Sequence, residues 1–300
     1  MRLRRQDRSD TIEAGHRHRE AGARRRVDRS DRRAEDRLTG KCQELLTPPA
    51  PLSTESGAFC FFDSMIVWRY LASEYAVAAF ETGDWKIGRV SELNDPLDCR
   101  PAILSSRSTN ISPIGDPYLV KHFIEMVGLL CYSEKIDDPA VWAHYGRNHT
   151  GVAFGFRFPD GPEKTTKVKY LRRRPRVYMD DLKKAKGEDL RKVVMRGWNS
   201  KAPGWRFEAE HRHFISMTPG AVEYRRPHFF RRVPWERLKY VVLGVRCPLS
   251  ILELMHLNRR IPGLPDGVTA IFQRAELDPL INRIDPRLPM KEGKIHPLFD

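Results

Sequence analysis

Two acidic residues separated by one position, Glu208 and Glu210, have the types and spacing that acid–base chemistry requires. Residues 204–214 predict a β-strand, on which every second side chain points to the same face. The two carboxylates would lie about 7 Å apart, close enough to contact one small ligand. Arg206 and Arg212 share that face and would keep both acids ionised. The alternative is a solvated face whose charges pair across the sheet. The opposite face would carry Trp205, Phe207, Ala209, His211 and His213.

The composition is that of a folded, basic protein. The chain has 300 residues, 40% of them hydrophobic and 10% aromatic, which is enough for a substantial core. Its net charge of +14 favours an anionic partner. The five cysteines form neither a disulfide framework nor a zinc-binding pattern, so we expect reduced thiols in a cytoplasmic protein. No apolar run is long enough to span a membrane, and no membrane partner is expected.

Residues 1–64 predict a disordered tail. The first forty are rich in arginine and acid and contain almost no large apolar residues, and a Pro/Ser stretch follows at 47–54. An arginine-rich arm can bind nucleic acid, but the segment can equally be an extension that the working protein does not need. Residues 65–285 then predict one folded domain, and residues 286–300 predict a C-terminal tail.

The elements that must position the acids follow from the pattern of residues 65–285. A β-rich strand at 65–70 leads into a helix that Gly83 ends. The Asp-Pro pair at 138–139 predicts the start of a helix that would run to residue 149. This mixture predicts the α+β class: a single domain with a curved mixed or antiparallel β-sheet and helices packed on it. Further strands are expected at 84–90, 127–133, 152–158 and 238–245, and a further helix at 118–126.

Three short motifs occur in a fixed order along the chain. The first is the corner Asn94-Asp95-Pro96-Leu97-Asp98, the second runs from Cys131 through Trp142 to His149 and Gly151, and the third is Lys201, Trp205, Glu208, Glu210 and Arg212. Together they resemble the bacterial family called domain of unknown function 2971, over about residues 68–244. The chain departs from that family at Leu93, Leu97 and Tyr132, where phenylalanine is usual. The resemblance implies no established activity, but it does imply a role in phage defence or as a toxin.

The order of elements also resembles the layout of ADP-ribosyltransferase folds, with an early strand ending in Arg69 and Tyr70 and a late Glu-x-Glu strand. Such enzymes cleave the glycosidic bond of NAD through an oxocarbenium-like state. The resemblance implies that Glu210 stabilises the positive charge and that Glu208 activates the acceptor. NAD is the expected substrate, with no certain cofactor and no metal. The expected substrate-binding residues are Arg69 for the pyrophosphate, Tyr70 or Tyr145 stacked on nicotinamide, and Asn94, Trp142 and Arg212.

Other interpretations use the same or different residues. Trp142 and Tyr145 can belong to a packed helix face, and Asn94 can belong to a structural corner. Basic segments at 169–176 and 224–232 can bind nucleic acid in a defence module without catalysis, or form a solvated charged surface. A metal-dependent nuclease is a further alternative, although its carboxylates lack a recognised nuclease spacing; it would use Asp95, Asp98, Glu208 and Glu210.

Overall fold

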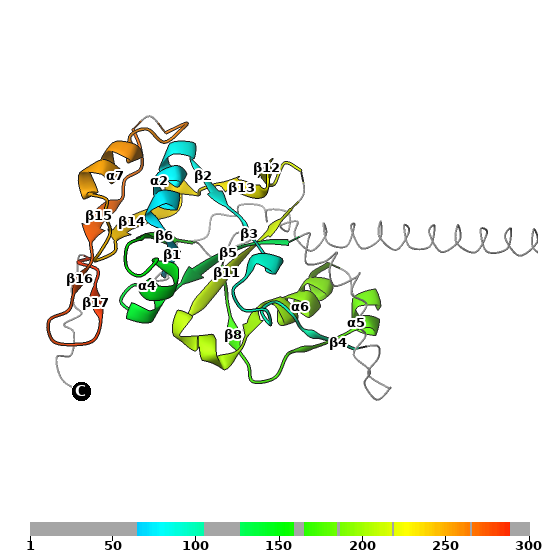
Figure 1. Cartoon of the computed structure of the whole chain (residues 1–300). Helices are drawn as coiled ribbons and strands as arrows, with labels where there is room; N and C mark the ends of the chain where they lie inside the picture. The colour runs from blue at the N-terminus through cyan, green and yellow to red at the C-terminus, as the bar shows by residue number, and fades with distance from the viewer. Residues whose placement is uncertain are drawn as a thin grey trace, which may run out of the picture. The chain divides into compact units, whose positions relative to one another are not determined.

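A mixed β-sheet forms the centre of the computed structural model (Figure 1). Its strands are β1 (Ile66–Leu71), β3 (Gly88–Arg89), β5 (Val127–Ser133), β6 (Val152–Arg157), β7 (Thr166–Lys167), β11 (Glu210–Ser216), β14 (Leu238–Leu243) and β15 (Ile271–Arg274). Their order is β15-β14-β6-β1-β5-β11-β7, and β3 pairs with β5 beside this path. The pairing is antiparallel except between β14 and β15. The predicted single α+β domain with a mixed, largely antiparallel sheet is therefore confirmed.

The structure describes residues 65–104, 127–158, 165–184, 187–217, 219–264 and 266–288. They all belong to one unit, residues 46–300. The predicted tail at 1–64, the predicted helix at 118–126 and most of the predicted C-terminal tail lie outside the described residues. Within the described ranges, no helix has the length and apolar character needed to cross a membrane.

The central strands are buried on both faces, which explains their nearly continuous apolar sequences. In β6, Phe154 and Phe156 enter one core cluster, while Ala153 enters the cluster on the other face. Burying each phenylalanine contributes roughly 1.5–3 kcal/mol. Helices α2 (Ser73–Thr82) and α7 (Ile251–Asn258) pack on the first face, and α4 (Pro139–Tyr145) packs on the second (Figure 1).

Smaller elements surround this sheet. They are β2 (Asp84–Lys86), η1 (Val90–Glu92), β4 (Ala102–Leu104), β8 (Lys169–Tyr170), β9 (Arg176–Tyr178), α5 (Met179–Lys184), α6 (Gly187–Trp198), β10 (Ser200–Lys201), η2 (Pro203–Glu208), β12 (Glu223–Arg225), β13 (His228–Arg232), η3 (Trp235–Arg237), β16 (Glu276–Leu277) and β17 (Ile284–Asp285). β2, β13 and β12 form a separate antiparallel sheet, whereas β4 pairs with β9 and β8 pairs with β10 in parallel.

Helix α4 begins where the sequence predicts and ends earlier. The Asp138 carboxylate accepts hydrogen bonds from Ala140 N at 2.9 Å and Val141 N at 3.3 Å, and therefore caps the first turn. The predicted extension to residue 149 is wrong, because the helix ends at Tyr145 and residues 147–149 all have positive φ angles. This left-handed run reverses the chain so that β6 can begin at residue 152.

The predicted strand at 204–214 is half wrong. Residues 203–208 form the 3₁₀ helix η2, which Pro203 opens, and β11 begins only at Glu210. Ala209 separates the two elements in a left-handed conformation, with φ 44° and ψ 54°. A proline at the first helical position is preorganised for a helical turn, which explains why alternation alone misassigned this segment. Glu208 and Glu210 therefore come from different elements.

Candidate functional site

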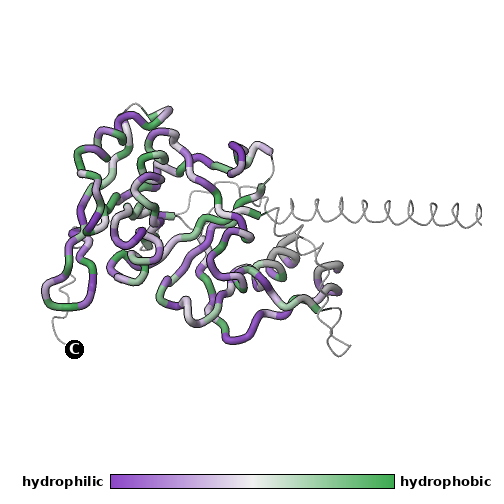
Figure 2. The backbone as a smooth tube through the Cα atoms, in the orientation of Figure 1, coloured by the Kyte–Doolittle hydropathy of each residue, from purple (hydrophilic) through white to green (hydrophobic). Residues whose placement is uncertain are grey.

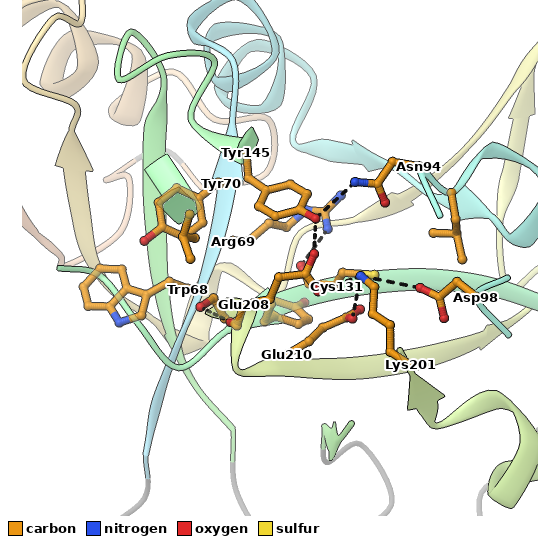
Figure 3. Close-up of a pocket in the computed structure, with 14 residues that line it drawn as sticks. Trp68, Arg69, Tyr70, Asn94, Asp98, Cys131, Tyr145, Lys201, Glu208 and Glu210 are labelled. Carbon is orange, nitrogen blue, oxygen red and sulfur yellow. Dashed lines mark hydrogen bonds and ion pairs between the residues drawn. The ribbon is translucent and has the colours of Figure 1, made fainter. Parts of the chain in front are cut away.

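A pocket of about 150 Å³ lies where β1, β5, α4, η2 and the corner at residues 93–98 meet (Figure 3). Trp68, Tyr70 and Tyr145 make part of its wall aromatic. The remaining wall carries Lys201 and both predicted glutamates. A cavity of this volume is large enough for one small aromatic ring. The pocket therefore surrounds a ring-sized space with aromatic and ionisable groups.

Lys201 is the centre of the charged wall. Its Nζ lies 2.6 Å from Glu208 Oε2, 3.3 Å from Glu210 Oε2 and 3.5 Å from Asp98 Oδ2, and the residue is only 7% exposed. Burial by itself would lower the pKa of Lys201, but Glu210 and Glu208 raise that pKa above its usual range. The ammonium group therefore stays charged and holds the two glutamates at one place (Figure 3).

Glu210 is held as an anion. Its carboxylate accepts hydrogen bonds from Arg212 Nε at 2.8 Å and from Arg212 Nη2 at 2.9 Å. Burial by itself would raise the pKa of Glu210, but Arg212 and Lys201 outweigh burial and lower this pKa to about 2. Glu210 is therefore a fixed negative charge on the pocket wall.

Glu208 lies on the other side of Lys201, in the last position of η2. Its Oε1 accepts a short hydrogen bond from Tyr145 Oη, and Asn94 Nδ2 in turn donates to Tyr145 Oη at 3.2 Å. Burial raises the pKa of Glu208, and Lys201 offsets only part of this effect. The pKa values of the two glutamates thus shift in opposite directions, so that one can exchange a proton while the other stays charged.

Arg212 does not line the pocket, and its expected contact with substrate is corrected to a structural role. The side chain is fully buried. Nη1 donates to the carbonyl oxygen of Trp198 at 2.7 Å, Nη2 donates to Asp98 Oδ2 at 2.7 Å, and Nε binds Glu210. Arg212 shares its strand face with Glu210, as the period of a strand requires. Its function is to fix the carboxylates of Glu210 and Asp98.

Trp142 belongs to the core, and its expected contact with substrate is likewise corrected. It is fully buried, and its Nε1 donates to the carbonyl oxygen of Ile136 at 2.6 Å. The ring of Tyr70 meets it edge-on, with centroids 4.9 Å apart. Its helix neighbours Val141 and Tyr145 line the pocket instead. Trp142 therefore supports the aromatic wall from behind.

Arg69 and Tyr70 reach the pocket from β1. Arg69 Nη1 donates to the carbonyl oxygen of Cys131 at 3.2 Å, and the guanidinium lies 5.0 Å from the Trp85 ring centroid. Arg69 Nε is buried without a hydrogen-bond partner in the described part of the chain. Tyr70 Oη donates to the carbonyl oxygen of Lys135 at 2.6 Å, so its ring is what it presents to the pocket. Arg69 Nε is thus a donor that a ligand could satisfy.

The sequence did not single out Lys201 as a member of this site, and it grouped Asp98 with the two glutamates only in the alternative of a metal-dependent nuclease. The only signal for Lys201 was its place in the motifs that resemble a family. No local period relates a residue at 98 or 201 to one at 208, because the contacts join four separate segments. The cluster contains two cations, Lys201 and Arg212, and three carboxylates, those of Asp98, Glu208 and Glu210. It therefore has an excess negative charge when Glu208 is ionised.

The four carboxylates suggested for a metal-dependent nuclease do not converge on an open site. Asp95 Oδ1 accepts from Leu97 N at 2.9 Å within its own corner, and Lys201 bridges the other three. Over the ranges that the structure describes, no group of three or more His, Cys, Asp or Glu side chains is placed to hold a metal ion. A divalent cation at the glutamates would have to compete with Lys201 and Arg212.

Comparison with known proteins returned no match to a family model, a curated protein or a solved structure. The resemblances to domain of unknown function 2971 and to ADP-ribosyltransferase folds therefore stay predictions. The pocket is the feature from which a function can be inferred.

Proposed function

We propose that the pocket binds the nicotinamide–ribose end of NAD and that the protein cleaves the bond between them, transferring the ADP-ribosyl group to water or to another acceptor. The observation that supports this proposal is the pair Glu208 and Glu210, bridged by Lys201 at the wall of a ring-sized pocket. The nicotinamide ring would occupy the aromatic part, formed by Tyr70 and Tyr145. The ribose would face the acids.

The opposite pKa shifts assign different roles to the two acids. The C–N bond breaks and its electron pair leaves with neutral nicotinamide, so positive charge develops on the ribose. Glu210 stabilises that charge because its pKa of about 2 keeps it ionised. Glu208 accepts the proton of the attacking water or hydroxyl group as the new C–O bond forms. Its raised pKa makes it the better proton acceptor of the two.

Release of nicotinamide from NAD by the full chain tests the proposal, with chromatography as the readout. We expect Glu210→Gln to lower the rate about 100-fold, because removing one preorganised electrostatic group from an active site costs that much. Glu208→Gln should also lower the rate. The matched control is Glu223→Gln, an exposed glutamate paired with Arg225 outside the pocket, which should leave the rate unchanged.

The proposal is wrong if NAD, its 2′-phosphate and nicotinamide mononucleotide all give neither nicotinamide release nor a thermal shift. A role in phage defence or as a toxin would follow, because the reaction would deplete the NAD of a host cell. The proposed substrate also agrees with a cytoplasmic location. The described cysteines, Cys99, Cys131 and Cys247, are free thiols, which suits a reducing compartment.

A further inference from the structure

The two basic segments that the sequence singled out differ in how their charges are used. In the segment 224–232, Arg225 pairs with Asp84 and Glu223 and lies 4.6 Å from the Phe230 ring centroid. Arg232 donates to the carbonyl oxygen of Pro262. These two arginines therefore already bind partners within the chain, and Arg225 also covers the Phe230 ring.

The segment 171–176, which is the loop after β8 and the first residue of β9, presents its charges to solvent. Arg172, Arg173, Arg174 and Arg176 are all exposed, and the described part of the chain offers none of them an ion pair. The parallel pairing of β4 with β9 brings the exposed Arg100 beside them, since Ala102 N donates to the carbonyl oxygen of Pro175 at 2.9 Å. The tube in Figure 2 is strongly hydrophilic along this loop. We call these five arginines the arginine corner.

A partly exposed aromatic surface lies next to the pocket. His144 is exposed, and Trp205 and Phe207 of η2 are half-buried. The His144 ring centroid lies 6.4 Å from that of Trp205 and 5.4 Å from that of Phe207. The sequence predicts Trp205 and Phe207 on one face of a strand, but both belong to η2, where they are half-buried with the exposed Arg206 between them. One face of the Trp205 ring contacts Lys201, whose Nζ is 4.8 Å from the ring centroid.

Lys201 also joins this aromatic surface to the arginine corner. Leu171, the first residue of the corner loop, donates its N–H to the carbonyl oxygen of Lys201 at 2.9 Å. β8 packs against η2, and Lys201 precedes η2 by two residues. The aromatic surface, the pocket wall and the arginine corner are therefore neighbouring parts of one region.

We propose that the arginine corner and the aromatic surface of η2 together bind single-stranded nucleic acid beside the pocket. Five exposed guanidinium groups exceed the two negative charges of a dinucleotide, so they suit a polyanion. Half-exposed aromatic rings suit unstacked bases, which present their faces only in a single strand. If the proposed NAD chemistry holds, the bound strand lies where it can serve as the acceptor.

The test measures binding without NAD, so that its outcome is independent of the proposed enzymatic activity. A fluorescent oligothymidine is titrated with the full chain at several salt concentrations, and anisotropy gives the affinity. We expect Arg172→Ser/Arg173→Ser to weaken binding and to reduce the salt slope by about 1.4, because each lost phosphate contact in a single strand contributes about 0.7. The matched control is Arg259→Ser/Arg260→Ser, which removes the same charge from exposed positions after α7.

Stacking is tested by Phe207→Ala, which leaves the charge unchanged. We expect it to weaken oligothymidine binding about 10-fold without changing the salt slope. Circular dichroism checks that each variant is folded. The proposal is overturned if the chain does not bind the oligonucleotide, if the two double variants lose affinity equally, if Phe207→Ala binds normally, or if oligoglutamate or duplex DNA binds as tightly as the single strand.

Discussion

Glu208 and Glu210 are two positions apart, and their surroundings give them opposite electrostatic behaviour. Arg212 contacts Glu210 through two nitrogens, at 2.8 and 2.9 Å, whereas Glu208 relies on Lys201 and on the neutral hydroxyl of Tyr145. A buried carboxylate keeps its charge only where enough charged hydrogen-bond donors surround it. The different pKa shifts of the two acids therefore depend on two cations: Lys201 contacts both carboxylates, and Arg212 contacts only that of Glu210.

This difference predicts distinct pH dependences of stability. The pKa of Glu210 falls from 4.5 to about 2 in the folded protein, so its contribution is present above pH 4.5 and is lost as the pH falls toward 2. The difference corresponds to roughly 3 kcal/mol. We expect Glu210→Gln to lower the free energy of unfolding by about this amount at neutral pH and to flatten its acid dependence. Urea denaturation at a series of pH values measures both effects.

Glu208→Gln is the comparison variant for that experiment. The pKa of Glu208 is raised by folding, so its neutral form suits the folded state and its stabilising contribution falls as the pH rises through that pKa. A neutral glutamine should therefore cost less stability at neutral pH than it does at position 210. A larger loss at position 208 would contradict the assignment of the permanent anion to Glu210.

At the scale of elements, the break between η2 and β11 brings Glu208 to the pocket. A continuous strand would place the side chains of Glu208 and Glu210 on one face, about 7 Å apart. The left-handed turn at Ala209 instead lets η2 pack against α4, where Tyr145 bonds Glu208. Because β11 begins only after this turn, Trp205 and Phe207 belong to η2 and not to the sheet.

Ala209 tests how much this turn is strained. A left-handed conformation costs an L-residue about 1–2 kcal/mol, and glycine avoids most of that cost while adding entropy to the unfolded chain. We expect Ala209→Gly to leave stability unchanged or to raise it by up to about 1 kcal/mol. Ala209→Val should lower it by about 2 kcal/mol, because a β-branched residue fits positive φ poorly. Thermal denaturation that ranked valine above glycine would contradict the left-handed turn.

At the scale of the whole molecule, the backbone just after β14 packs closely against the loop that follows α4. Gly244 N donates to the carbonyl oxygen of Gly151 at 2.9 Å, and Arg246 N donates to that of His149 at 3.0 Å. A Cβ atom on Gly244 would lie only 2.2 Å from the His149 carbonyl oxygen. The loop therefore holds α4, and with it Tyr145, against the sheet.

Gly244→Ala is expected to destabilise the protein by about 3 kcal/mol, because backbone must move to admit the methyl group. The control is Gly204→Ala in η2, where a Cβ atom would meet nothing within 4 Å. Its stability should change by less than about 0.5 kcal/mol. Chemical denaturation of the two variants measures the difference, and equal stabilities would contradict the close approach.

Much of the fold follows from local patterns in the sequence. The apolar run of β6, the proline-led start of α4 with its Asp138 cap, and the glycine stop after α2 each depend on neighbours within a few residues. Such signals act through backbone geometry and burial, which a single segment largely determines. The α+β class and the central strands β1, β5, β6 and β14 were therefore predictable, whereas the strand predicted at 84–90 is divided into β2 and β3.

The charged site was decided by the tertiary structure. Asp98, Lys201, Glu208 and Arg212 are brought together from separate segments by sheet order and by the turn at Ala209. Whether an arginine faces a ligand, as the sequence suggested for Arg212, or is buried between two carboxylates depends on which distant residues it meets. The sequence determined which groups could ionise, and only the folded packing decided their partners, because burial and charge–charge distance are properties of three-dimensional contacts.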